Sequence, residues 1–487
     1  MKYLKGNNAI LQIIALCIIS RIPMLTSPNM VLDGDESIVG LMAKHLFEGK
    51  ELPIYFYGQR YGLTIIEELF ILPFYVFLGV TGLAVKLGVL SLWTIGVIFF
   101  YKTCEALNKK NVFIPLLLTL LLIICPAWTE WSMKARGGYV TAFTLSAVTT
   151  YLLCIERKRG LVFYTLIGLL LVLVYESMSL WMPFLVLLTI YKLAKEFSFS
   201  KIVALCASIV LLLVCLRLYK TTLYDFHQFD PILPAGEWLN NVSRIPAFLY
   251  HSLHGYHYFF TSYEPGIFQV VFAAIFFIIT FFAIALGLVL SVRKKAIDFH
   301  LLVFTIPIIG SLLITIVAPY TNFRFLLPVT AAVLLLVQLL LNRLRLSALY
   351  MIPACVIIVS GSISLFTFRN FKFTVMNEDN ITEVAQYLKS RNIRYVYSQH
   401  IYLAWQLIFY SEEDIICRDV SKLGRVPQYH LMIDNALKDG KKTALIGVKD
   451  DYFGLDIKDP VFIDLIYIKE DMPIEQLAQN FAIQYTR

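Results

Sequence analysis

Charged residues are scarce in this sequence. Asp, Glu, Lys and Arg make up only 16% of its 487 residues, whereas 58% are apolar. Soluble domains carry about 25% charged residues, and a soluble chain of this composition would have more apolar surface than its core could bury. The composition therefore excludes an ordinary soluble protein. It predicts a polytopic α-helical membrane protein whose excess apolar surface faces the bilayer.

Paired cysteines are also missing. The eight cysteines are scattered, none forms a CxxC motif, and most lie inside apolar runs. This pattern excludes a disulfide framework and a cysteine-based metal site, because both use characteristic cysteine spacings. The N-terminal segment lacks a small-x-small cleavage signal, so we expect residues 9–25 to be an uncleaved first span.

Long apolar runs are abundant, and about eleven of them have the length to cross a bilayer. Basic clusters between the runs mark the cytoplasmic ends by the positive-inside rule, which explains the net charge of +8 without a nucleic-acid partner. This sidedness leaves 26–81, 128–138, 220–266 and 370–487 outside, with short outer turns near 176 and 320. The expected spans are 9–25, 83–102, 112–127, 139–155, 161–176, 178–192, 201–219, 267–292, 300–319, 323–341 and 346–366.

Residues 62–80 are apolar enough to span but do not fit this count. If both 62–80 and 83–102 crossed, Lys109 and Lys110 would lie outside and every later segment would be inverted. Glu67 and Glu68 would also be costly in hydrocarbon. We therefore expect 62–80 to lie along the outer interface or to dip into it.

The character of the sequence changes after residue 370, where charge rises and turn residues become frequent. Residues 381–390 and 403–411 are predicted to be helices, and 393–398, 414–420, 442–448 and 460–468 to be strands. The sequence thus predicts a membrane domain over 1–369 and a small outer α/β domain over 370–487.

An acidic cluster follows the first span. Asp33, Asp35 and Glu36 precede an amphipathic segment, 37–50, which is expected to be a helix at the outer interface. The cluster could simply cap that helix, but a cap needs one acidic residue and here there are three within four positions. Asp35 and Glu36 are therefore catalytic candidates; a divalent ion on the three acids is a less favoured alternative.

A polar and aromatic strip, ELPIYFYGQRYG, occupies the same outer loop. Its candidate residues are Tyr57, Gln59 and Arg60, which could form the wall of a sugar or phosphate pocket. The competing interpretation is a set of aromatic-belt residues at the membrane interface.

Further polar residues fall in the other outer segments. Lys134 and Arg136 are basic residues in an expected outer segment, where the positive-inside rule predicts few of them. They indicate a nearby anion, although contact with lipid headgroups would also explain them. Glu176 lies in a short turn and could be a solvated acid. Asn322 and Arg324 open a span, where Arg324 could clamp a phosphate or snorkel.

The order of these motifs resembles the integral-membrane glycosyltransferases of the GT-C fold. The closest branch contains the protein O-mannosyltransferases and the aminoarabinose transferases of lipid A. The resemblance rests on the Asp35-Glu36 pair, LMAKHLFEGK, FYGQRYG, KARGGY and NFRFLLP. The chain departs at Gly58-Gln59-Arg60, where the mannosyltransferase branch carries His-Pro-Pro or Lys-Pro-Pro. The resemblance implies a GT-C-like bundle with juxtamembrane helices in the first outer loop, and no metal cofactor.

The resemblance also implies residue roles. Asp35 would be the general base for the acceptor hydroxyl, and Glu36 would help to order the site. Arg60, Arg136 and Arg324 would hold the phosphate of the donor lipid. The full set of candidate substrate-binding residues is Asp33, Tyr57, Gln59, Arg60, Lys134, Arg136, Glu176, Asn322 and Arg324.

The implied activity is transfer of a hexose or pentose from a polyprenyl-phosphate donor to a glycan, lipid or protein acceptor. The enzyme would lie in the cell membrane, with its site and its C-terminal domain on the extracytoplasmic side. Two alternatives remain open, a lipid or solute transporter and a non-catalytic scaffold for envelope assembly. A transporter is less favoured, because the ionisable residues gather on one face rather than at mid-membrane.

Overall fold

The computed structural model describes residues 7–27, 30–108, 113–155, 159–223, 232–253, 299–318, 323–344, 377–420, 424–449 and 459–473, with isolated positions elsewhere. The predicted spans at 267–292 and 346–366 lie mostly outside the described residues.

Four described helical stretches are long and apolar enough to cross a membrane: Asn8–Leu25, Gly82–Leu107, Phe199–Thr221 and Arg324–Leu341. The first joins α1 (Asn7–Ile19) to α2 (Ile22–Leu25), and the last joins η4 (Phe323–Leu326) to α15 (Leu327–Leu344). The other two are α5 (Gly82–Leu107) and α11 (Phe199–Thr221). Shorter apolar helices are α6 (Phe113–Ile124), α8 (Tyr139–Cys154), α9 (Leu161–Ser177) and α14 (Phe299–Val317). Also described are α7 (Pro126–Trp131), η2 (Ser179–Trp181), α10 (Met182–Lys195), η3 (Ala235–Glu237) and α12 (Trp238–Leu253).

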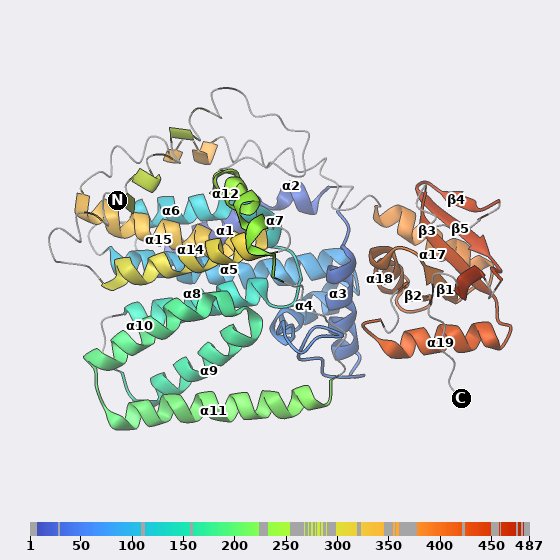
Figure 1. Ribbon diagram of the computed structural model, residues 1–487, viewed down its shortest axis with the longest axis horizontal. Coiled ribbons are helices and arrows are strands. Elements are labelled where there is room, and N and C mark those ends of the chain that lie inside the picture. Colours follow the sequence, from blue (N-terminus) through green and yellow to red (C-terminus); the bar gives the residue numbers. More distant parts are fainter. Residues whose placement is uncertain are drawn as a thin grey trace.

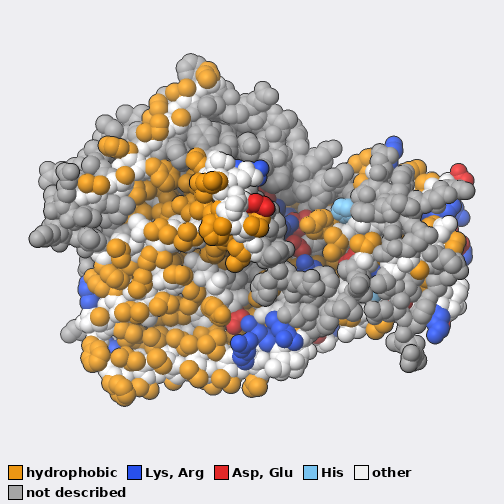
Figure 2. Space-filling view, in the orientation of Figure 1, with side chains coloured by type: hydrophobic (Ala, Val, Ile, Leu, Met, Phe, Trp, Pro, Cys, Tyr) orange, Lys and Arg blue, Asp and Glu red, His pale blue; other side chains and the backbone are white. Residues whose placement is uncertain are grey.

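These helices form an elongated bundle with α5 at its centre, packed against α4, α6 and α8 (Figure 1). α14 packs on α15, and α9 packs on α11, which lies at the edge of the bundle. α11 exposes large apolar side chains such as Val210, Leu211 and Leu218. Figure 2 shows hydrophobic side chains spread over this part of the molecule. Such a surface suits lipid rather than water, as the composition predicts.

Helix α3 (Gly34–Phe47) runs across the end of the bundle, between the bundle and the C-terminal domain (Figure 1). The predicted helix is therefore present, but its expected polar face is not exposed, since Lys44 and His45 are both buried. α4 (Ile65–Leu78) packs on α3 and α5. Its 14 residues extend about 21 Å at 1.5 Å per residue, less than the roughly 30 Å of a hydrocarbon core.

The C-terminal domain is built on a five-stranded mixed sheet of order β2-β1-β3-β5-β4. The first three strands in this order are parallel, and β5 pairs antiparallel with β3 and β4. The elements are α17 (Glu378–Ser390), β1 (Tyr395–Ser398), α18 (Ile401–Tyr410), β2 (Ile416–Arg418), α19 (Pro427–Lys438), β3 (Thr443–Val448), β4 (Val461–Ile463) and β5 (Ile466–Glu470).

The predicted α/β character is thus confirmed, with two differences. The single strand expected over 460–468 is a hairpin, because the chain turns at Asp464, whose φ is +50°. Helix α19 was not predicted from the sequence. The domain boundary at 369/370 lies outside the described residues and stays a prediction.

The C-terminal domain docks on α3 through α18. Glycines allow the close approach, since a Cβ on Gly34 would lie 2.6 Å from the Tyr402 ring and one on Gly40 would lie 2.6 Å from the Phe409 ring. The amide of Gln406 donates to the Leu32 carbonyl at 2.7 Å. α3 therefore connects the membrane bundle to the domain.

Candidate active site

An open cleft of about 650 Å³ lies where one end of the bundle meets α3 and the C-terminal domain. α8 and α15 begin at this end of the bundle, and α9, α11 and α14 end there. This is the arrangement expected for helices that cross a membrane in alternate directions. The cleft thus gathers segments far apart in the sequence. Its charged lining residues are Asp35, Arg136, Glu176, Lys220, Arg324 and Arg425.

The three clustered acids have different environments. Asp33 is the N-cap of α3: its carboxylate accepts from the Glu36 amide at 3.0 Å, and Glu36 accepts from the Asp33 amide at 3.0 Å. This reciprocal capping box satisfies two backbone donors that the helix leaves unpaired. The capping interpretation therefore applies to Asp33 and Glu36, while Asp35 lines the cleft.

Glu36 is fully buried behind the cleft. Its Oε1 lies 2.5 Å from Nζ of Lys86, which is also fully buried and comes from α5. A buried carboxylate without its cation would be strongly unfavourable, so this ion pair fixes the N-terminal turn of α3 to the bundle. Glu36 can orient Asp35 through that turn, but it does not line the cleft.

Asp35 is the half-exposed acid of the cluster, with 27% of its side chain accessible. Its Oδ2 lies 3.6 Å from Nη1 of Arg136, and its Oδ1 lies 3.6 Å from Nη2 of Arg425. Both distances are too long for hydrogen bonds. Asp35 is therefore a carboxylate held between two guanidinium groups, with a face open to the cleft.

Arg136 connects two of the acids, because its Nη2 also donates to Asp33. Burial by itself would raise the pKa of Asp33, but the Arg136 guanidinium, with Lys134 nearby, holds that pKa well below its ordinary value. Asp33 therefore stays ionised and acts as the fixed counterion that aims Arg136 at the cleft.

Three loops at this end of the bundle interlock through glycines to hold Arg136. Gly62, Gly137 and Gly138 all have positive φ, which L side chains rarely adopt. A Cβ on Gly62 would lie 2.7 Å from the Gly137 carbonyl oxygen, and one on Gly138 would lie 2.9 Å from the Ser177 carbonyl oxygen. The amides of Gly137 and Gly138 donate to Glu67 at 3.3 and 2.9 Å. Glu67 therefore faces a backbone turn rather than lipid.

Glu176 also lines the cleft. Its Oε2 accepts from Nζ of Lys220 at 2.5 Å and from the Tyr55 hydroxyl at 3.1 Å. The Gly62 amide donates to its backbone carbonyl at 3.2 Å. Glu176 is thus a carboxylate held in one orientation by Lys220 and Tyr55, and it can accept hydrogen bonds from a polar ligand.

Arg324 enters the cleft from η4, at the start of α15. Its guanidinium lies 5.0 Å from the centre of the Phe325 ring, within the range of a cation–π contact. Gln59 also lines the cleft. The structure therefore brings Asp35, Arg136, Glu176, Arg324 and Gln59 into one site, whereas Asn322 lies outside the described residues.

Besides Asp33 and Glu36, three predicted site residues do not line this cleft: Tyr57, Arg60 and Lys134. The Tyr57 hydroxyl lies 2.7 Å from Nδ1 of His45. Arg60 donates from Nη2 to the Leu223 carbonyl at 3.1 Å. Lys134 pairs with Glu130 one turn earlier in the chain.

Sequence reasoning missed Lys220 and Arg425. Lys220 follows the predicted span 201–219 at its expected outer end, where the positive-inside rule predicts few basic residues. The argument that singled out Lys134 could therefore have identified Lys220 from the sequence. Arg425 lies in the loop before α19, and its place beside Asp35 depends on domain docking. Within the described residues, no group of three or more His, Cys, Asp or Glu is arranged to hold a metal ion.

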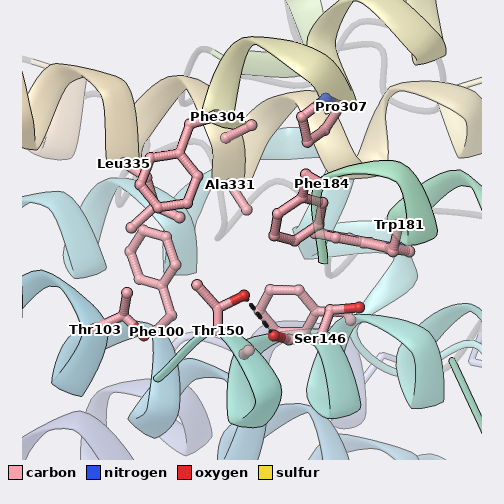
Figure 3. Close-up of a pocket in the computed structure, with 13 residues that line it drawn as sticks. Phe100, Thr103, Ser146, Thr150, Trp181, Phe184, Phe304, Pro307, Ala331 and Leu335 are labelled. Carbon is pink, nitrogen blue, oxygen red and sulfur yellow. Dashed lines mark hydrogen bonds between the residues drawn. The ribbon is translucent and has the colours of Figure 1, made fainter. Parts of the chain in front are cut away.

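A second, smaller cavity of about 20 Å³ lies inside the bundle and shares no lining residue with the cleft. Figure 3 shows Phe100, Phe184 and Phe304 around it, with the Thr150 hydroxyl donating to the Ser146 carbonyl at 2.7 Å. Its volume is close to the space of one water molecule.

Comparison by sequence finds no matching protein-family model and no matching curated protein. Comparison by structure finds a similar fold, that of a mostly helical multi-pass membrane protein with a C-terminal sheet domain. The structural matches include ArnT from Cupriavidus metallidurans in the apo state, with a TM-score of 0.62 and 10% identity over 95% of this chain and 98% of that one.

The same protein bound to undecaprenyl phosphate matches with a TM-score of 0.60 and 9% identity, over 95% and 98% of the two chains. These likenesses confirm the predicted resemblance to the lipid A aminoarabinose transferases at the level of the fold. At such low identity they carry over no residue role and no substrate.

Proposed function

We propose that the protein transfers a sugar from a polyprenyl-phosphate donor to an acceptor outside the cytoplasm. The observation that carries the proposal is the cleft, in which Asp35 lies beside Arg136 in a space that Arg324 also lines. Sugar transfer from a lipid phosphate needs a base for the acceptor and cations for the leaving group. Both kinds of group line this one space.

In the proposed reaction, Asp35 takes the proton of the acceptor hydroxyl as that oxygen attacks C1 of the sugar. The bond between C1 and the phosphate oxygen breaks, and its electron pair leaves with the lipid phosphate. Water later accepts the proton from Asp35. Asp33 and Glu36 act indirectly, because they cap and anchor the turn that carries Asp35.

Arg136 and Arg324 are the proposed ligands of the departing phosphate, since planar guanidinium groups bind two phosphate oxygens at once. Glu176 and Gln59, on the cleft wall, are the proposed partners of sugar hydroxyls. Lys134, Arg60 and Tyr57 lie outside the lining and would contribute through charge or support.

The proposed location is the cell membrane, with about eleven spans and with α3 and α4 as juxtamembrane helices. The basic clusters Lys192/Lys195 and Lys109/Lys110 would be cytoplasmic. The cleft and the domain over 370–487 would then be extracytoplasmic. Because the structurally similar ArnT is bound to undecaprenyl phosphate, that lipid is the first donor carrier to test.

The test uses membrane vesicles that contain the protein and a panel of tritium-labelled undecaprenyl-phosphate sugars. Asp35→Asn keeps the shape of the side chain but removes the base, so transfer of label should fall by about 100-fold or more. Asp414→Asn is the matched control, since Asp414 is an exposed acid that pairs with Lys389 and does not line the cleft.

Undiminished transfer by the Asp35→Asn variant would remove Asp35 from the role of base. Passage of an intact labelled donor across the vesicle membrane, with no transfer product, would instead favour a transporter.

A further inference from the structure

We propose that the C-terminal domain completes the catalytic cleft by supplying Arg425, a positioning residue that orients Asp35 together with Arg136. This inference rests on the proposed function and assigns the domain a direct part in it. The observation behind it is that Arg425 lines the cleft and lies 3.6 Å from Asp35, although 390 positions separate the two residues in the sequence.

Arg425 is held in place by the first outer loop. Its guanidinium lies 4.8 Å from the centre of the Phe56 ring, and its Nη1 donates to the Tyr57 carbonyl at 3.4 Å. Only 15% of the side chain is accessible. A guanidinium that stacks on an aromatic face and bonds to a backbone carbonyl has lost much of its freedom, so it presents its charge in a defined direction.

The two guanidinium groups contact different oxygens of Asp35. Arg425 approaches Oδ1 and Arg136 approaches Oδ2, each at 3.6 Å. This arrangement restrains the carboxylate from two sides by charge, and neither contact is short enough to occupy an oxygen by hydrogen bonding. An acceptor hydroxyl can therefore still bond to Asp35 while the orientation of the carboxylate is set.

Docking of the domain determines where Arg425 lies. Glu413, in the turn after α18, accepts from Lys44 at 2.5 Å and from the Tyr429 hydroxyl at 2.8 Å, and it lies 3.0 Å from Nε2 of His45. Lys44 and His45 belong to α3, the helix that carries Asp35. Tyr429 belongs to α19, just after Arg425. Helix α3 thus carries Asp35, the proposed base, and also binds the domain that supplies Arg425.

The activity test compares Arg425→Ala, Arg425→Lys and wild type in the vesicle assay at a saturating donor concentration. Arg425→Ala should lower the maximal transfer rate by about tenfold, because the Asp35 carboxylate loses one of the two guanidinium groups that orient it. Arg425→Lys should recover part of this loss. Arg391→Ala is the matched control, because Arg391 is an exposed arginine of the same domain that pairs with Glu470.

Binding of undecaprenyl phosphate to the purified proteins separates positioning from phosphate binding. Arg425→Ala should keep the affinity for this lipid within about twofold of wild type, whereas Arg324→Ala should lose about tenfold. An unchanged transfer rate for Arg425→Ala would overturn the proposal. A tenfold loss of lipid affinity in Arg425→Ala would also overturn it, because Arg425 would then be a phosphate ligand.

A third measurement does not depend on transfer, so failure of the proposed function would not hide the result. Melting temperatures are compared for Asp35→Asn, Arg425→Gln, the double variant and wild type. Coupled residues give non-additive effects, so Arg425→Gln should lower the melting temperature less when Asp35 is already Asn. Additive changes would show that the two side chains do not interact, and the positioning role would be refuted.

Discussion

At the scale of single residues, three neighbouring acids differ because their surroundings differ. Asp33 is bound by Arg136 and by the Glu36 amide, and Glu36 is bound by Lys86. Asp35 has only longer charge contacts and a face on the cleft. A base needs access to its substrate, so geometry favours Asp35 among the three.

His45 illustrates a titratable contact between the domains. Burial by itself would lower its pKa, but its contacts with Glu413 and Glu51 outweigh burial and raise the pKa above the ordinary value of 6.5. The Tyr57 hydroxyl and Lys44 lie on the same network. A raised pKa in the folded protein means that protonation of His45 stabilises the fold.

This stabilisation is complete below the unfolded pKa near 6.5 and is lost as pH rises through the folded pKa. We therefore expect the melting temperature of the purified protein to fall as pH rises above about 6.5. His45→Gln should flatten that dependence, because Gln does not titrate. An equally steep dependence in the variant would assign the titration to another group. Glu413, whose pKa is held low, titrates far below this window.

At the scale of elements, the site is assembled by interlocked loops rather than by one motif. FYGQRYG and KARGGY pack on each other through Gly62 and Gly137, and the second loop also packs on Ser177 at the end of α9. The positive φ angles allow these close approaches. Arg136 is therefore aimed by backbone packing as well as by its ion pair with Asp33.

Gly62→Ala tests this arrangement, with Gly49→Ala as control. Both glycines have similar φ, +76° and +68°, so each substitution should cost about 1–2 kcal/mol of backbone strain. Only a Cβ on Gly62 collides, 2.7 Å from the Gly137 oxygen, whereas Gly49 has open space. We expect Gly62→Ala to lower transfer in the vesicle assay by at least about tenfold, and Gly49→Ala to retain it. Similar activity in both variants would argue against packing as the cause.

At the scale of the whole molecule, the cleft lies where helix ends meet a docked domain. A lipid phosphate that binds there would contact groups from the bundle, α3 and the C-terminal domain together. Such a ligand binds the folded protein only and stabilises it by mass action, by about 2.7 kcal/mol at a free concentration 100-fold above Kd.

Undecaprenyl phosphate should therefore raise the melting temperature of the wild-type protein in detergent. Undecaprenol, which has the same tail without the phosphate, should have a much smaller effect, and Arg324→Ala should reduce the difference between the two lipids. Equal stabilisation by both lipids would mean that the tail alone binds, and the cations would have no role in recognising the phosphate.

Much of this arrangement could be predicted because it depends on local or periodic properties. Apolar runs predict membrane helices, and short alternating segments predict β1, β2 and β3. The positive-inside rule assigns Asp35, Arg136, Glu176 and Arg324 to the same side of the membrane. The structure brings these side chains to one cleft. The turn at Asp464 was missed, because its positive φ leaves no clear signal in the run PVFIDLIYI.

The acidic cluster after the first span was visible in the sequence from its composition alone, together with the membrane class of the chain and the α/β character of its end. Which of the three acids lines a cleft depends on what each one binds, and those partners, Arg136 and Lys86, come from distant helices and loops. Arg425 lies beside Asp35 only because α18 docks on α3 through the close approaches at Gly34 and Gly40. Local sequence determines helices, strands and sidedness, since these follow from hydrophobicity and backbone preference. Only tertiary packing determines which charges lie within a few ångströms of one another, and that distance decides what the site can do.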